Sequence, residues 1–298
     1  MAKGRELKGR IKSVENTRKI TRTMEMVAAS KMKRAQDRVA AARPYATALG
    51  EVLSRLYSPE LAERFPLLRQ PEPANAAAGA RAMAGRRVAL VLLTSNRGLA
   101  GGFNANLIKE ARTRLAELEA NGAEVELHVV GRKGIGFFRY VGRTVAVQRT
   151  DVTDRPTAAD AASLVDGLMD DFVARRLDAV YVVYARFVSA LSTPPTTLQV
   201  LPVAPPAGAG AGAQRDYILA PSAEAILTEL LPSYVRNSVY RALAETAAAE
   251  QGARRTAMKS ATDNATELLN LYKRTYNRAR QAQITQEIAE IVGGAAAI

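Results

Sequence analysis

The sequence predicts an α/β fold, in which a central Rossmann-like α/β domain is flanked by long N- and C-terminal helices forming an antiparallel coiled coil. Heptad-spaced apolar residues at both ends of the chain, where glycine and proline are scarce, predict the helices. Between the ends, apolar strand-like segments alternate with helical ones, which predicts a mostly parallel sheet covered by helices. A length of 298 residues agrees with more than one domain.

The N-terminal helix is predicted by a seam of positions spaced alternately four and three residues apart, from Leu7 to Leu56. Twelve of these fifteen positions are apolar, and the exceptions are Arg18, Thr21 and Glu25. A helix of this length is roughly 80 Å long, too long for a compact domain, so we expect it to pair with another helix. Pro44 is its weak point, because proline removes a backbone hydrogen bond.

The C-terminal segment shows the same spacing and predicts the partner helix. Between Ser222 and Val292 it contains one proline and one glycine, and Gly293-Gly294 is expected to end the helix. The predicted seam residues are Met258, Ala261, Ala265, Leu268, Tyr272, Thr275, Ala279 and Ala282, and the pattern resumes in a new frame at Ile284, Ile288 and Ile291. We expect the first helix to lie antiparallel against part of this longer one.

The middle of the chain alternates strands and helices. Strands are predicted over 88–94, 124–130, 144–148, 179–187 and 196–201, and helices over 105–120, 132–140 and 157–175. The expected organisation is a shaft helix over 1–57, a linker over 58–86, a globular domain over 87–203, a flexible loop over 204–220 and a second shaft helix over 221–298.

Positive charge is concentrated at the N-terminal end. The chain has a formal net charge of +13, and residues 1–57 hold 14 Lys and Arg against 5 Asp and Glu. Such a helix indicates a surface for nucleic acid, for a membrane or for an acidic protein, or else a solvated face. The absence of cysteine excludes disulfides and thiolate sites and favours a reducing, cytoplasmic compartment. No apolar run is long enough to span a bilayer.

The sequence offers no convincing active site, so we predict no catalytic, cofactor-binding or metal-binding residues. The glycine-rich segments 97–102 and 131–136 each lie at a strand-to-helix junction, but their spacing matches neither dinucleotide-binding nor phosphate-binding loops. Tight turns require such glycines without any ligand. His128, the only histidine, falls on the polar side of an alternating strand, where a surface position is expected.

Three strings resemble the γ subunit of the F-type ATP synthases. Residues 11–32 (IKSVENTRKIT…MEMVAASKM), 261–288 (ATDNA…YNRARQAQITQEI) and 95–104 (SNRGLAGGFN) match its terminal and central signatures in the right order along essentially the whole chain. The chain departs from the family pattern at Asn96, where an acid is usual, at Ala100, where cysteine is frequent, and at Arg255-Thr256, where Met-Ala is expected.

The resemblance implies a non-catalytic rotor shaft that couples proton-driven rotation of a membrane ring to ATP synthesis or hydrolysis on β subunits. It implies as partners the hexamer of α and β subunits, the ε subunit and the c-subunit ring, but no nucleic acid. The implied location is peripheral, on the cytoplasmic face of a bacterial plasma membrane. The implied contacts with β are Arg18, Lys19, Arg22, Met24, Lys31, Lys33, Arg34, Arg280, Gln281 and Thr285.

The alternative from the residues alone is a basic coiled-coil protein that binds nucleic acid through phosphate neutralisation. Residues 1–44 contain no aromatic side chain, which counts against stacking on bases. A nucleotide-binding enzyme built on the α/β domain is the third possibility.

Overall fold

The computed structural model describes residues 2–56, 64–69, 83, 85–204 and 222–295. The chain forms two compact units, Met1–Ala29 with Arg254–Ile298, and Ser30–Ala253. Helices α1 (Ala2–Leu56) and α6 (Ala223–Ala295) each contribute to both units. Most of the expected linker 58–86, and the expected loop 204–220 from residue 205 onward, lie outside the described residues.

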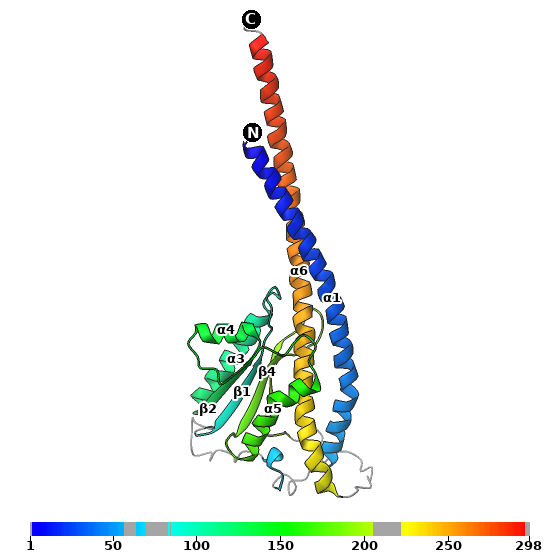
Figure 1. Cartoon of the computed structure of the whole chain (residues 1–298), viewed down its shortest axis with the longest axis vertical. Helices are drawn as coiled ribbons and strands as arrows, with labels where there is room; N and C mark the ends of the chain where they lie inside the picture. The colour runs from blue at the N-terminus through cyan, green and yellow to red at the C-terminus, as the bar shows by residue number, and fades with distance from the viewer. Residues whose placement is uncertain (1, 57–63, 70–82, 84, 205–221, 296–298) are drawn as a thin grey trace. The chain divides into compact units, whose positions relative to one another are not determined.

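The unit Ser30–Ala253 contains a five-stranded sheet in the order β3-β2-β1-β4-β5 (Figure 1). Its strands are β1 (Arg87–Leu93), β2 (Glu124–Val130), β3 (Val147–Arg149), β4 (Ala179–Ala185) and β5 (Pro195–Leu201). Four strands are parallel, and β5 pairs antiparallel with β4. This order, with helices between the strands, confirms the predicted Rossmann-like α/β domain.

Strand β1 is central because its apolar run, Val88–Leu93, is buried on both faces. On one face, alternate residues of β1 pack against α3 (Phe103–Ala120) and α4 (Arg132–Tyr140). On the other face, Ala89, Val91 and Leu93 join a cluster with α5 (Ala158–Val173) and with part of α6. The short 3₁₀ helix η1 (Pro66–Leu68) adds Leu67 and Leu68 to this second cluster, a contribution that the sequence pattern did not predict.

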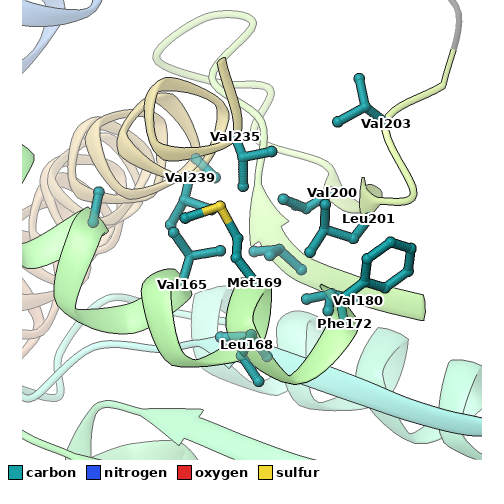
Figure 2. Close-up of a cluster of buried hydrophobic side chains, with 14 of the residues drawn as sticks. Val165, Leu168, Met169, Phe172, Val180, Val200, Leu201, Val203, Val235 and Val239 are labelled. Carbon is teal, nitrogen blue, oxygen red and sulfur yellow. The ribbon is translucent and has the colours of Figure 1, made fainter. Parts of the chain in front are cut away.

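Helix α6 is attached to the α/β domain through this second cluster. Figure 2 shows Val165, Met169 and Phe172 of α5 with Val235 and Val239 of α6. Within α6, Leu227, Leu231, Val235 and Val239 recur every four residues, so one stripe of the helix faces the domain. Buried branched and aromatic side chains of this kind each stabilise a fold by about 1.5–3 kcal/mol. The segment of α6 from Leu227 to Leu243 is therefore an integral part of the domain core.

Within Ser30–Ala253, α1 and α6 are antiparallel. Ala35 and Val39 of α1 form a buried cluster with Ala244 and Ala248 of α6. Farther along, Leu53 and Leu56 share the larger cluster with Leu227 and Leu231. The numbers of the facing residues therefore rise in α1 as they fall in α6, which confirms the predicted orientation (Figure 1). The alanines permit the close approach of the two backbones.

In the unit Met1–Ala29 with Arg254–Ile298, the two helices meet at Thr21 and Thr262, whose hydroxyl oxygens are 2.8 Å apart. The predicted N-terminal seam is confirmed here, because its positions from Leu7 to Ala28 are all buried or half-buried. In the C-terminal helix, the predicted set of buried seam positions is wrong by one residue at Leu268. Leu269 is 2% exposed, whereas Leu268 is 44% exposed. The pattern 258, 262, 265, 269 fits the seam better because it keeps Thr262 opposite Thr21.

Helix α1 continues through Pro44, as its seam predicted, but two local expectations differ from the structure. Helix α6 continues through Gly293-Gly294 to Ala295. A glycine inside a helix costs only about 1 kcal/mol, which is too little to end a long helix by itself. The third strand begins at Val147 rather than at residue 144, since its ladder with β2 starts opposite His128.

Candidate partner-contact surface

Four of the predicted contact residues lie on α1 within Met1–Ala29. Lys19 and Arg22 are exposed, while Arg18 and Met24 are half-buried. Lys19 lies 3.7 Å from Glu15 on the same helix, a weak exposed ion pair. Arg18 occupies a seam position, so its stem contributes to the helix pair as well as to the surface. Exposed apolar residues lie beside these cations, namely Ile20, Met26 and Val27.

Three more predicted contacts, Lys31, Lys33 and Arg34, lie on α1 within Ser30–Ala253. Lys33 and Arg34 are exposed and interact within the helix, with the Asp37 carboxylate at 2.9 Å and the Ser30 hydroxyl at 3.2 Å. Both side chains can therefore turn toward a partner at small cost. Lys31 is different, because its ammonium donates to the carboxylate of Asp154 at 2.6 Å.

Asp154 belongs to the segment between β3 and α5, far from Lys31 in the sequence. The hydrogen bond from Lys31 lowers the pKa of Asp154 below its usual value, and the nearby Arg97 and Arg155 act in the same direction. Arg38 of α1 also donates to the backbone carbonyl of Asp154, at 3.4 Å. The structure thus gives Lys31 a partner within the chain that the sequence pattern did not reveal.

The C-terminal candidates Arg280, Gln281 and Thr285 are all exposed on α6. The Thr285 hydroxyl donates to the backbone carbonyl of Gln281 at 3.0 Å, within the same helix. From the same stretch onward, Ile284, Ile288, Ile291 and Val292 are between 47% and 71% exposed. An apolar stripe of this size on an otherwise polar helix is typical of a surface that a partner covers.

The glycine-rich junction after β2 is explained by packing. Gly131 has a φ of +100°, and a Cβ there would collide with the Thr94 carbonyl oxygen. A Cβ on Gly134 would lie 2.8 Å from the Thr94 hydroxyl oxygen, which accepts a hydrogen bond from the Gly134 amide. The first amides of α4, those of Arg132 and Lys133, donate to Asn96 and Ser95. Protein acceptors thus take the amides that would otherwise bind a phosphate.

Asn96, where the resemblance leads one to expect an acid, connects two loops. Its amide nitrogen donates to the carbonyl oxygens of Thr150 and Val152, each at 3.0 Å. Its amide oxygen accepts from the Arg132 amide at 3.1 Å. A carboxylate could accept from Arg132 but could not donate to the two carbonyls. The amide at this position therefore holds the segment that leads to Asp154.

The expectation that His128 is a surface histidine is wrong. Its side chain is 13% exposed, and burial lowers its pKa below 6.5, against the opposing effect of Glu126. The alternation along β2 correctly places His128 on the opposite face of the strand from Leu127 and Val129. It does not show how much of the His128 face is covered by the rest of the domain. Two carboxylates act on the imidazole, that of Glu126 at 3.6 Å and that of Asp171, and both oppose the effect of burial on its pKa.

Two buried polar contacts are not predicted by the sequence. Thr21 interrupts the apolar seam, and its hydroxyl lies opposite that of Thr262, so the two residues form a polar pair. Glu245 of α6, which is 7% exposed, accepts a hydrogen bond from the Phe187 amide just after β4. Neither contact had a signal in the spacing, because each depends on a residue more than fifty positions away.

In the part of the chain that the structure describes, no group of three or more His, Cys, Asp or Glu side chains is arranged to hold a metal ion. Among the same residues, no helix has the length and hydropathy needed to cross a membrane.

Comparisons with known proteins match essentially the full length of the chain, and all of them indicate the same family. A family model described as ATP synthase matches residues 3–298. The ATP synthase gamma chain of Gemmatimonas aurantiaca is 73% identical over 299 residues, which cover 100% of this chain and 99% of that protein. The gamma chain of Frankia casuarinae is 42% identical over 304 residues, with 99% and 97% covered.

Solved structures show the same fold at low sequence identity. A chain of the Euglena gracilis mitochondrial ATP synthase (OSCP/F1/c-ring) superposes with a TM-score of 0.67 at 19% identity, covering 99% of this chain and 94% of that one. A chain of the Tetrahymena thermophila mitochondrial central stalk/c-ring has a TM-score of 0.55 at 23% identity, with 81% and 99% covered. From its fold, its signatures and these relatives, the chain belongs to the ATP synthase γ-chain family.

Proposed function

We propose that this chain is the central rotor shaft of an F-type ATP synthase, and that its terminal helices turn inside a ring of α and β subunits. The observation that carries the proposal is the antiparallel helix pair, one end of which is built into the α/β domain core. Rotation of the domain is therefore transmitted to the helices through packed side chains. The family assignment favours this role over a nucleic-acid-binding coiled coil.

The catalytic sites lie on the β subunits in this proposal, and the shaft changes their nucleotide affinity by presenting different faces in turn. The exposed cations of α1 and the exposed Arg280, Gln281 and Thr285 of α6 are the surfaces that meet β. Exposed ion pairs are worth roughly 0–1 kcal/mol each, so many modest contacts hold no single orientation too tightly. The α/β domain meets the ε subunit and the c ring, on the cytoplasmic face of a bacterial membrane.

Reconstitution tests this proposal directly. The purified chain is mixed with α and β subunits and fractionated by size, and ATPase activity is measured for the isolated chain and for the complex. We expect no hydrolysis by the chain alone, and an active complex of three α, three β and one γ. Robust hydrolysis by the isolated chain, or failure to enter a complex, would contradict the proposal.

Charge reversal tests the contact surface. The variant Arg22→Glu, Lys33→Glu, Arg34→Glu changes three exposed side chains of α1. The matched control Lys109→Glu, Arg132→Glu, Arg139→Glu changes three exposed cations of the α/β domain by the same total charge. We expect only the first set to impair assembly or coupled ATP synthesis, with the helical circular dichroism of both variants unchanged. Equal impairment by both sets would contradict the proposal that the α1 cations form a specific contact surface.

A further inference from the structure

The segment between β3 and α5 is held in place by bonds at both of its ends. On the β3 side, Arg149 donates to the Asp151 carboxylate at 2.7 and 2.5 Å, which lowers the pKa of Asp151 to about 2. On the α5 side, Thr157 and Asp160 form a reciprocal capping box. Between them, the Val152 side chain is buried in the domain core, and Asn96 donates to the Val152 carbonyl.

This fixed segment presents one carboxylate, Asp154, to helix α1. Lys31 donates to it at 2.6 Å, and Arg38, two turns along the helix, donates to the Asp154 backbone carbonyl. The side chains of Lys31 and Asp154 are 37% and 33% exposed, so their pair is less screened than one at a fully solvated surface. Both the acceptor carboxylate and the acceptor carbonyl come from a single residue.

The contact lies beside a second close approach within the same unit. Gly252 of α6 is buried, and a Cβ there would lie 3.4 Å from the Ala190 carbonyl oxygen and 3.6 Å from the Met32 sulfur. Ala190 belongs to the turn between β4 and β5, and Met32 follows Lys31 on α1. The α/β domain thus contacts the helix pair from two of its loops, with α1 at Lys31 and with α6 at Gly252, which lies close to Met32 of α1.

We propose that Asp154 is a positioning residue, and that its bond to Lys31 fastens α1 to the α/β domain so that torque passes through both helices of the shaft. The proposal rests on the rotor function proposed above. It also reassigns Lys31, since the cation that the family resemblance directs toward β is here used inside the chain. Lys33 and Arg34 keep their exposed positions for a partner.

The test is a charge swap in the complete, membrane-reconstituted synthase. Lys31→Asp, Asp154→Lys and the double variant are compared for ATP hydrolysis and for ATP-driven proton pumping. Lys109→Asp serves as the control, because Lys109 is an exposed cation of α3 outside the predicted contact surface. We expect each single change at 31 or 154 to lower the number of protons pumped per ATP, and the double variant to recover most of the wild-type ratio. Lys109→Asp should leave the ratio at the wild-type value.

The underlying bond is measured separately by hydrogen exchange of the assembled complex. Exposed ion pairs contribute up to about 1 kcal/mol, so Asp154→Asn should speed exchange of the amides around 150–155 by up to about fivefold, and high salt should do the same to the wild type. If Lys31 instead contacts β, the Asp154→Lys variant will pump normally and the double variant will show no recovery, which overturns the proposal. The rotor function itself fails only if the wild-type chain does not assemble or couple.

Discussion

At the scale of single residues, Gly131 shows which features of a turn can be predicted from the sequence and which cannot. Strand-to-helix turns were predicted to need glycine without a ligand, and Gly131 confirms that reading through its φ of +100°. The partner that makes it indispensable, the Thr94 carbonyl, lies just after the end of β1 and has no local signal. A single sequence therefore predicts which turns need glycine, but it does not predict which residue of a neighbouring segment the glycine contacts.

Gly131→Ala should destabilise the domain severely. The new methyl group would collide with Thr94 and would occupy a backbone conformation that L-residues rarely adopt, so we expect a loss of about 2 kcal/mol or more in urea unfolding. Gly136→Ala is the matched control, because Gly136 lies in α4 with nothing near its Cβ position. That change should be neutral or should stabilise the fold by about 0.5–1 kcal/mol. Equal effects would contradict the close approach at Gly131.

His128 provides a second residue-scale prediction. Burial lowers its pKa in the folded chain below 6.5, so the unfolded chain binds the proton more readily. Its contribution to stability is complete above pH 6.5 and is lost as the pH falls through the lowered folded-state pKa. We expect His128→Gln to flatten the pH dependence of urea unfolding in this window. An unchanged pH profile in the variant would show that His128 is solvated.

At the scale of elements, the heptad spacing of α1 predicted the buried face well. The spacing works because a long helix that pairs with one partner repeats the same contact every seven residues. The frame of α6 was harder to predict, since Leu268 and Leu269 are adjacent and equally apolar, and only the position of Thr262 opposite Thr21 selects Leu269. The contacts of the α/β domain with α1, such as Lys31 with Asp154, follow no periodicity and could not be predicted.

Introduced cysteines test the register of the helix pair, and the chain contains no native cysteine to interfere. Ala35 and Val39 lie in one buried cluster with Ala248 and Ala244, so Ala35→Cys/Ala248→Cys and Val39→Cys/Ala244→Cys should form intramolecular disulfides on mild oxidation. Ala40→Cys/Ala244→Cys is the control, because Ala40 is exposed and points away from the seam. Intermolecular dimers from both seam pairs on non-reducing gels would show that the helices do not pair as described.

At the scale of the whole molecule, sequence signatures and fold agree on a subunit of a rotary enzyme. The class of fold, both terminal helices and the family could all be predicted, because they rest on long repeated patterns and specific strings. The residues that meet each partner follow less directly, since an exposed cation on a helix serves a partner and solvent equally well until its neighbours are known. Lys31 and Lys33 illustrate this. They lie two residues apart on α1, yet Lys31 pairs with Asp154 of the α/β domain, whereas Lys33 pairs with Asp37 of its own helix.

If this chain turns within its complex, a marker attached to it will be seen to rotate. Tyr140 is 90% exposed on the α/β domain, so Tyr140→Cys offers a single site for attaching a bead to the chain. The complex with α and β subunits is fixed to a surface through β, and the bead is observed in the microscope as ATP is added. We expect unidirectional rotation that requires ATP and stops when the ATP is removed. A complex that hydrolyses ATP while the bead shows only Brownian motion would contradict it.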